Sequence, residues 1–508
     1  MKKKRSVLNV LSSLISQLSS LALGLIIPRL VLVNLGSESN GLITSINNVL
    51  TYVALLEAGV GAASMQALYK PISEQDTKEI NAILSATAHF YRKTGVMYFS
   101  AVVLLTLIFP LTVKTEIPAG QVMLVVCLSG LPGVASYFFQ GKYRVFLMAE
   151  GKGYFLTNLG TFFHFLTSVI KILLLNTGFG IVAVQTLGFV SSLLQVVCIE
   201  IYIHRHYRWI NLKEPPAVTR ISQSKNALVH QIAWLITSNT DTIILTYFCG
   251  FKVVSVYAIY AYLFGFLDGL IGAVTNGVHF AMGQTYQSDT EGYQRIHGVY
   301  EVCIITACFA FFTIAAIFTN PFLKLYTANV NDIQYCDPLL PYLFAAVHIL
   351  VQARATSWET ISVAGHFKET QHQPIIEAIV NLTISLALVP RFGIYGVLAG
   401  TVVASSYRLV AMIHYSRRKL LGDKSWITVQ RYFVNIILTV IVGFLSKSIM
   451  RINMDTYLTV FISAVIVCLI VLPVYFAVNL FFEKESLAFL LNYAKMFWKR
   501  DQKDNDSQ

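Results

Sequence analysis

The sequence predicts an all-α, polytopic membrane protein with about 14 transmembrane helices, arranged as two six-helix lobes plus two extra C-terminal helices. Long apolar segments recur along the whole chain and are joined by short polar connections. Hydrophobic residues make up 55% of the chain and charged residues 13%, against roughly 25% charged in soluble domains. Short motifs also recur at an offset of about 214 residues, which indicates a parallel internal repeat.

Each expected helix follows from the thickness of a bilayer, because a hydrocarbon core of about 30 Å takes roughly 20 apolar helical residues. The basic stretch Lys2–Arg5 leads into the first apolar run without an A-x-A cleavage site, so we expect a retained first helix. The expected spans, in chain order, are 8–33, 41–66, 96–116, 120–141, 154–176, 179–203, 228–249, 253–280, 299–320, 338–363, 374–392, 394–415, 431–450 and 456–482.

Lysine and arginine are distributed unevenly between the two sets of connections. About 28 of them fall on the side of the N-terminus and about seven on the other side. Because basic residues stay in the cytoplasm, both termini are expected to be cytoplasmic. The net charge of +12 therefore indicates membrane topology, and no nucleic-acid partner is expected.

The expected domains follow from one long, charged connection that contains Pro215-Pro216. They are an N-terminal lobe (1–203), a cytoplasmic linker (204–227), a C-terminal lobe (228–416), two additional helices (417–482) and a cytoplasmic tail (483–508). Six helices are an even number, so both lobes enter the membrane in the same orientation and are related by an axis along its normal. The matches that support the repeat are Gln17 with Gln231, Gly36 with Gly250, Glu57 with Asp268, Gly151 with Gly365, and Phe179-Gly180-Ile181 with Phe392-Gly393-Ile394.

Two arginines inside apolar segments are candidates for binding an anionic cargo. A charge inside the membrane is costly and usually functional, and the guanidinium fork matches phosphate oxygens. Arg354 falls near the middle of the span at 338–363, and Arg29 follows Pro28 in the first helix. For Arg29 the alternative is a side chain that reaches the outer headgroups.

Four acidic residues are candidates for ion coupling or for a gate: Asp241, Glu57, Asp268 and Glu359. Asp241 is expected to be buried, where a carboxylate could pair with a basic group or bind H⁺ or Na⁺. Glu57 and Asp268 are repeat equivalents that either border the cytoplasmic mouth or end a helix near the headgroups. Glu359 lies five residues after Arg354, about 140° around a helix, so the two need separate partners.

Polar residues at helical spacing are candidates for lining a cavity, with helix packing as the alternative. They are Gln17, Ser20, Asn239 and Asn381. Glu377 follows Pro374 in the first turn of its helix, where a capping role and a transport role are both possible. His164, His279 and His348 are interpreted as isolated, hydrogen-bonded core histidines, and Arg417 and Arg431 are assigned to a cytoplasmic connection. Seven cysteines without CxxC or Cys/His spacing predict no disulfide framework, and no metal site, cofactor or catalytic set is expected.

The chain resembles the polysaccharide-type flippases (Wzx-like translocases of O-antigen and capsule) of the multidrug/oligosaccharidyl-lipid/polysaccharide exporter superfamily. The residues that carry the resemblance, within residues 6–480, are Leu56-Glu-Ala-Gly-Val-Gly61, Ala364-Gly365, and Phe392-Gly-Ile-Tyr-Gly396 with Gly400-Thr401. It implies two lobes around a central cavity with alternating access, in a bacterial cytoplasmic membrane. The implied cargo is an undecaprenyl-pyrophosphate-linked oligosaccharide that moves to the outer leaflet, where polysaccharide assembly proteins would be partners.

Two other functions stay open from the sequence alone. A multidrug or metabolite cation antiporter would share the fold. A membrane polysaccharide polymerase or ligase would need a large outside loop with catalytic residues, and the outside connections are short. The sequence shows no ATP site, so an uphill step would draw on an H⁺ or Na⁺ gradient or on consumption of the product.

Overall fold

The computed structural model describes residues 2–57, 59–217, 225–449 and 454–489. These residues are almost entirely helical and form no strand. Among the described residues, ten helices are long and apolar enough to cross a membrane, or 11 if the bent pair Leu23–Glu57 and Val60–Glu74 counts as one span. The predicted all-α, multi-span fold is therefore confirmed, although this criterion does not reproduce the count of 14.

The difference in count arises partly where an expected span is interrupted. The expected helix at 338–363 consists of two shorter helices, α11 (Leu340–Ala353) and α12 (Ala355–Val363), which meet at Arg354. The expected spans at 8–33 and 228–249 include residues whose side chains lie outside the described part of the chain. Residues 218–224 of the expected linker and 490–508 of the expected tail lie outside the described part of the chain.

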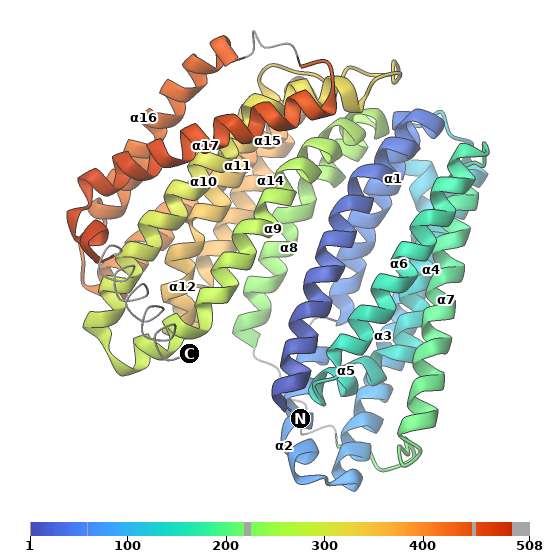
Figure 1. Cartoon of the computed structure of the whole chain (residues 1–508). Coiled ribbons are helices and arrows are strands. Elements are labelled where there is room, and N and C mark those ends of the chain that lie inside the picture. The colour runs from blue at the N-terminus through green and yellow to red at the C-terminus, as the bar shows by residue number, and fades with distance from the viewer. Residues whose placement is uncertain (1, 58, 218–224, 450–453, 490–508) are drawn as a thin grey trace, which may run out of the picture. The chain divides into compact units, whose positions relative to one another are not determined.

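The chain forms two compact units. The first comprises Met1–Ala258 with Asn329–Ile333, and the second comprises Ile259–Ala328 with Gln334–Gln508. The first unit contains α1 (Lys2–Val53), η1 (Ala54–Glu57), α2 (Val60–Glu74), α3 (Thr77–Thr112), α4 (Ala119–Ala135), the π-helical turn η2 (Ser136–Gln140), α5 (Gly141–Ala149), α6 (Gly153–Asn176), α7 (Ile181–His206) and α8 (Lys225–Cys249) (Figure 1).

The core of the first unit consists of apolar side chains from several of these helices. Leu42, Leu84, Val125 and Leu147 are fully buried in one cluster. Gly36 (φ 80°, ψ 169°) interrupts the helical conformation within α1 and divides it into two helical segments. Glycine suits this turn because a Cβ atom disfavours a positive φ.

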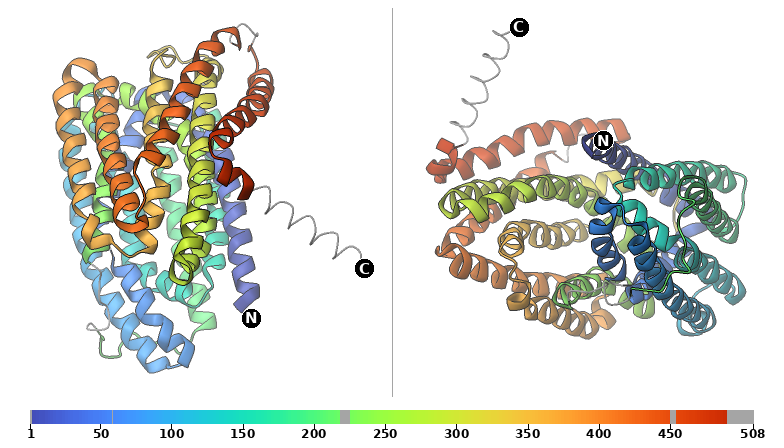
Figure 2. Two further views of the ribbon diagram at one scale, coloured as in Figure 1. Left: turned by 90° about the vertical axis from the view of Figure 1, so that its left-hand side faces the viewer. Right: turned by 90° about the horizontal axis from the view of Figure 1, so that it is seen from below.

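The second unit contains most of α9 (Phe251–Ser288), then α10 (Thr290–Tyr326), α11, α12, α13 (Phe367–Thr370), α14 (His372–Phe392), α15 (Ile394–Tyr415), the π-helical turn η4 (Ser416–Leu421), α16 (Trp426–Ile449) and α17 (Tyr457–Phe482). The helices α14 and α15 lie side by side (Figures 1 and 2). A Cβ atom at Gly400 would lie 2.3 Å from Ser385 Oγ, and one at Gly396 would lie 2.7 Å from the Leu388 backbone. These glycines therefore let the two helices pack closely.

The backbone itself repeats at the offset found in the sequence. Gly36 and Gly250, 214 residues apart, have φ values of 80° and 82°. Gly151 and Gly365, also 214 residues apart, have φ values of 79° and 73°. At both of the latter, the glycine N–H binds the carbonyl three residues back, and the next N–H binds the carbonyl five residues back. This hydrogen-bond pattern is a helix C-cap that favours glycine.

The two compact units defined by residue contacts do not coincide with the two copies of the sequence repeat. Helix α8 packs with α1 in the first unit, whereas the repeat begins its second copy near residue 228. The lobes 1–203 and 228–416 therefore remain a proposal about internal symmetry, and the added helices 417–482 correspond to η4, α16 and α17.

Candidate functional site

Arg354 lies at the break between α11 and α12 and contacts two other helices of the second unit. Its Nη1 atom is 2.5 Å from Oε1 of Glu377 on α14. The other carboxylate oxygen of Glu377 is 3.9 Å from Nε of Arg408 on α15. Two guanidinium groups therefore share one carboxylate that is only 4% exposed. We call Arg354, Glu377 and Arg408 the arginine pair site, and it carries an excess of one positive charge.

Arg408 of the arginine pair site, and Gln373 four residues before Glu377, have polar atoms without partners among the residues that the structure describes. Arg408 is 5% exposed, its Nε contacts Met412 Sδ at 3.2 Å, and its Nη1 has no hydrogen-bond partner. Oε1 of Gln373, in the first turn of α14, is also buried and unpaired. Leaving a buried charged donor unsatisfied costs free energy. The site therefore has the charge and a free donor for an anionic oxygen.

Two histidine–carboxylate pairs link α9 to α11 and α12. Asp268 Oδ2 is 2.8 Å from Nδ1 of His348. The carboxylate of Glu359 is 2.8 and 2.9 Å from Nδ1 of His279. As the helical spacing predicts, Arg354 and Glu359 have separate partners on other helices. His279 and His348 are hydrogen-bonded as expected, but they are not isolated, because each pairs with a carboxylate on another helix.

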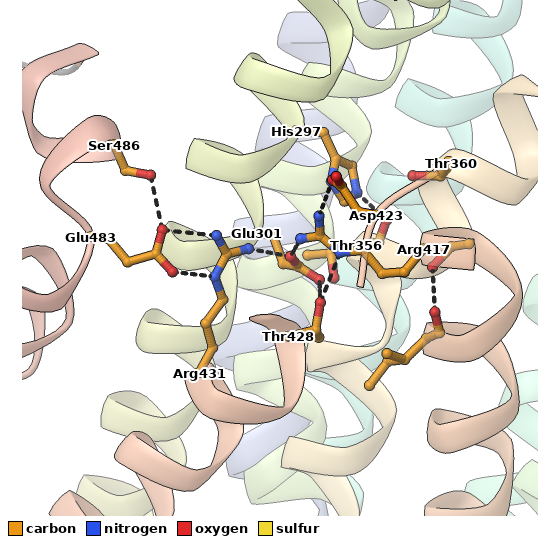
Figure 3. A network of polar contacts seen from close by, with 12 residues as sticks. His297, Glu301, Thr356, Thr360, Arg417, Asp423, Thr428, Arg431, Glu483 and Ser486 are labelled. Atoms are coloured by element: carbon orange, nitrogen blue, oxygen red, sulfur yellow. Dashed lines mark hydrogen bonds and ion pairs between the residues drawn. The ribbon is translucent and has the colours of Figure 1, made fainter. Parts of the chain in front are cut away.

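Glu301 of α10 is fully buried in an ionic cluster with arginines of η4 and α16 (Figure 3). Arg417 and Arg431 both donate to Glu301 Oε2, and Thr428 donates to Oε1 at 2.8 Å. Arg431 also forms a bidentate pair with Glu483, at 2.7 and 2.9 Å. Arg417 and Arg431, which the sequence assigns to a cytoplasmic connection, are both buried, and they join η4, α16 and the end of α17 to α10.

Replacing Glu301 by glutamine is expected to destabilise the protein by about 3–5 kcal/mol, because two buried arginines lose their shared carboxylate. Thermal unfolding of the purified protein in detergent measures the effect. Glu291→Gln, at an exposed position in the first turn of the same helix, is the matched control and should change stability little. Equal unfolding temperatures for the two variants would contradict the structural role of the cluster.

In the first unit, hydroxyl and amide side chains join the second half of α1 to α8 and the start of α9. Ser45 Oγ is 2.7 Å from Thr246 Oγ1, and Tyr52 Oη is 2.7 Å from Thr240 Oγ1. Asn40 donates to Ser255 Oγ at 2.8 Å. We call these three contacts the polar seam. Each single contact is modest in net free energy, so the seam can separate more readily than a close-packed apolar interface.

The remaining acidic candidates lie on α8 and beside η1. Asp241 is 3% exposed and accepts a hydrogen bond from Tyr257 Oη at 3.1 Å. Asn239, two residues earlier, donates to the Leu235 carbonyl of its own helix at 3.0 Å. Glu57 accepts a hydrogen bond from Tyr91 Oη of α3. Asp241 is thus buried as expected, and Glu57 and Asp268 pair with different kinds of residue despite their equivalence in the repeat.

The polar candidates of α1 and α14 have contrasting environments. Gln17 and Ser20 are exposed on α1, and Arg29 is half-buried one residue after Pro28. Asn381 is fully buried and donates to Thr401 Oγ1 of α15 at 2.8 Å. Its side chain therefore contributes to the packing of α14 against α15. Glu377, Asn381 and Ser385, spaced four residues apart on α14, are all buried, so this face of the helix is turned into the second unit.

Asp337, in the connection between α10 and α11, is held by hydrogen bonds. Burial raises its pKa, but the hydroxyl of Tyr395 and the N–H groups of Leu339 and Leu340 donate to the carboxylate, and the net effect lowers the pKa. A lowered folded-state pKa stabilises the protein above the unfolded pKa of about 3.9, and this stabilisation is lost as the pH falls through the folded value.

Asp337→Asn is therefore expected to lower the unfolding temperature at neutral pH, and the difference from the parent should shrink at acidic pH. Thermal unfolding measured across a pH series checks both parts. Asp455→Asn, in the described connection before α17, serves as the control. A pH-independent difference would mean that the carboxylate charge contributes nothing.

No family model and no curated relative matches the sequence. Solved structures do match. A multidrug resistance MATE family transporter of the MOP superfamily, in an inward-facing conformation, is 13% identical over 80% of this chain and 95% of its own, with a TM-score of 0.63. The lipid II flippase MurJ, in an inward closed conformation, is 12% identical over 93% of this chain and 99% of its own, with a TM-score of 0.67. The chain has the same fold as these two transporters.

A third match agrees with this assignment of the fold. The MATE multidrug transporter DinF-BH is 14% identical over 83% of this chain and 96% of its own, with a TM-score of 0.57. At 12–14% identity these matches establish the fold alone. The expected fold is therefore confirmed, while the assignment to a polysaccharide flippase family is a proposal.

Proposed function

We propose that the protein is an alternating-access transporter that flips an undecaprenyl-pyrophosphate-linked oligosaccharide to the outer leaflet of a bacterial cytoplasmic membrane. The observation that carries the proposal is the arginine pair site, where Arg354 and Arg408 share Glu377. This buried group has a net positive charge and an unpaired guanidinium nitrogen. Those properties suit a pyrophosphate group, which offers several anionic oxygens to two guanidinium forks.

The sign of the charge separates the main functional alternatives. An organic cation would be repelled by the excess positive charge of the arginine pair site, since charges interact strongly where water is scarce. A cation antiporter would instead rely on the acidic residues Glu57 and Asp241 of the first unit. Because the fold is also that of MATE transporters, the experiments below include a cation antiporter as the alternative. Transport of an organic cation is the result that would favour it.

The extent of the structural matches also supports a lipid-linked cargo. The match to the lipid II flippase covers 93% of this chain, whereas the matches to the two MATE transporters cover 80% and 83%. The difference is at least 10% of 508 residues, about 50, which is close to the length of α16 and α17. A chain that shares this additional length with a lipid flippase is more simply explained as a lipid transporter.

A depletion experiment in the native cell tests the proposal. When the protein is depleted, lipid-linked oligosaccharide should accumulate in the inner leaflet, and surface polysaccharide should decline. The leaflet is assigned by adding a membrane-impermeant lectin to intact and to opened spheroplasts. Unchanged delivery of the lipid-linked units to the outer leaflet would overturn the proposal, whereas loss of resistance to cationic compounds alone would favour the antiporter.

A further inference from the structure

The second helical segment of α1 begins at Ser37, on the side expected to be outer, and a residue from a distant connection caps it. Oδ2 of Asp332 accepts a hydrogen bond from the Ser37 N–H at 2.8 Å, and Oδ1 accepts one from the Ser37 hydroxyl at 2.7 Å. The first N–H groups of a helix lack partners within it, and the helix dipole favours a negative charge there. Asp332, between α10 and α11, therefore caps a helical segment that begins 295 residues earlier in the chain.

The first turns of α9 pack closely against the same segment of α1. A Cβ atom at Gly41 would lie 1.9 Å from the carbonyl oxygen of Phe251, so the backbones of the two helices are in direct contact there. One turn further along α9, Ser255 accepts the hydrogen bond from Asn40 that belongs to the polar seam. A side chain at position 41 would have to hold the two backbones apart, so glycine permits this close contact.

An ion pair joins this region to the connection between α3 and α4. Lys252 Nζ is 2.9 Å from Oε1 of Glu116, and the N–H of Glu116 donates to Glu38 of α1 at 3.0 Å. The side chain of Glu116 is 78% exposed, and ion pairs in water contribute little free energy. The capping contact and the backbone contact are therefore expected to contribute more. We call the four residues that make them, Ser37, Gly41, Phe251 and Asp332, the outer latch.

Both segments that dock on α1 in the outer latch come from the second copy of the sequence repeat. Contacts place the chain up to Ala258, and again Asn329–Ile333, in the first unit, whereas the repeat assigns residues 228–416 to the second copy. The chain thus leaves the second unit after Ala328, docks on α1 and returns at Gln334. These docked segments are the ones that would have to leave α1 if the two copies separated on this side.

The connection between α10 and α11 is bound at two points that are five residues apart. Asp332 contacts Ser37, whereas Asp337 accepts hydrogen bonds from the hydroxyl of Tyr395 and from two N–H groups at the start of α11. The carbonyl of Asp337 also accepts one from Asn320 at 2.8 Å. Five extended residues span at most about 18 Å, so a wide opening requires one point to release. Asp337 is held by more of these hydrogen bonds, so Asp332 is expected to release first.

We propose that the outer latch is a releasable contact that holds the outer side closed, and that Asp332 must leave Ser37 before that side can open. The proposal rests on the alternating-access cycle of the proposed function, and it applies to any cargo. Undocking removes the carboxylate from the start of the second segment of α1 and leaves N–H groups there to water. The strength of the latch therefore sets the share of molecules that are open on each side.

Spin-label distances measured in the full-length protein in lipid nanodiscs test the latch without any cargo. In a background without the native cysteines, one pair of labels is placed on the outer side, at the exposed residues Asn176 and Arg391, and the other on the inner side, at the exposed residues Glu74 and Lys368. Asp332→Ala should shift the equilibrium about 5- to 30-fold toward molecules with a longer outer and a shorter inner distance, since it removes a helix cap.

A second variant acts through a different contact, and two controls are matched to the pair. Gly41→Ala should shift the distances in the same direction, because the added methyl group separates α1 from Phe251. Asn331→Ala changes the exposed neighbour of Asp332, and a Cβ atom at Gly120, in the first turn of α4, would meet nothing within 4 Å. Asn331→Ala and Gly120→Ala should therefore leave both distances unchanged.

Two results would overturn the proposal. One is that Asp332→Ala and Gly41→Ala give the same distances as their controls. The other is a longer outer distance with an unchanged inner distance, which would show local fraying of α1 without a change of the open side. Failure of the parent protein to flip lipid-linked oligosaccharide in proteoliposomes would instead count against the proposed function, and the spin-label result would still decide whether the latch exists.

Discussion

Replacing Arg408 by glutamine should slow flipping of the lipid-linked oligosaccharide by about 10- to 100-fold. A hydrogen bond to a charged group contributes roughly 1.5–3 kcal/mol, and Arg408 has the unpaired nitrogen that is free to make such a bond. The ion pair between Arg354 and Glu377 would remain, so the protein should still fold and insert. The rate is measured in proteoliposomes as the protection of labelled cargo from an external lectin.

Two further variants make this prediction specific. Arg408→Lys keeps the charge but loses the planar fork, so it should recover only part of the rate. Arg391→Gln removes an exposed arginine from the end of α14 and should leave the rate unchanged. If Arg408→Gln flips cargo as fast as Arg391→Gln, the arginine pair site does not bind the cargo.

Cross-linking the polar seam should stop transport almost completely. The side-chain oxygens of Ser45 and Thr246 are 2.7 Å apart, so cysteines at both positions can form a disulfide with small adjustments. In the proposed alternating-access cycle we expect α1 to separate from α8 in one state, and a covalent link would remove that state from the ensemble. Flipping by the Ser45→Cys/Thr246→Cys variant should be lost under oxidising conditions and restored by a reductant.

The matched control uses a position two residues away. Asn47 is exposed and lies about 200° around the helix from Ser45, so the Asn47→Cys/Thr246→Cys pair should neither cross-link nor lose activity. The single cysteine variants test for disulfides with the native cysteines, all seven of which are free. Full activity of the cross-linked Ser45/Thr246 pair would show that the seam stays closed during transport.

Apolar length and repetition were enough to predict the fold from the sequence. The expected spans follow from hydropathy alone. Gly151 and Gly365, which are 214 residues apart, both have a positive φ because each ends a helix. The break at Arg354 could not be predicted, since the residues on both sides remain apolar and helical. Arg354 itself keeps φ and ψ values of −70° and −12°, close to those of a helix.

The candidate site was predicted only in part. A lone charge in an apolar segment is visible in a sequence, which is why Arg354, Asp241 and Glu359 could be named. Their partners come from other helices, and helix packing decides which ones meet. Nothing local distinguishes Arg408 and His348 from structural residues. Arg417 and Arg431 follow a charged connection, and only the fold shows that Glu301 lies between them.

The most direct test of the central claim is to compare two cargoes in the same proteoliposomes containing the purified full-length protein. Undecaprenyl-pyrophosphate-linked oligosaccharide should move between leaflets much faster than in protein-free vesicles, and the rate should fall with Arg408→Gln. A fluorescent organic cation should cross no faster than in vesicles without protein. Transport of the cation, without movement of the lipid-linked oligosaccharide, would contradict the proposal of a glycolipid flippase.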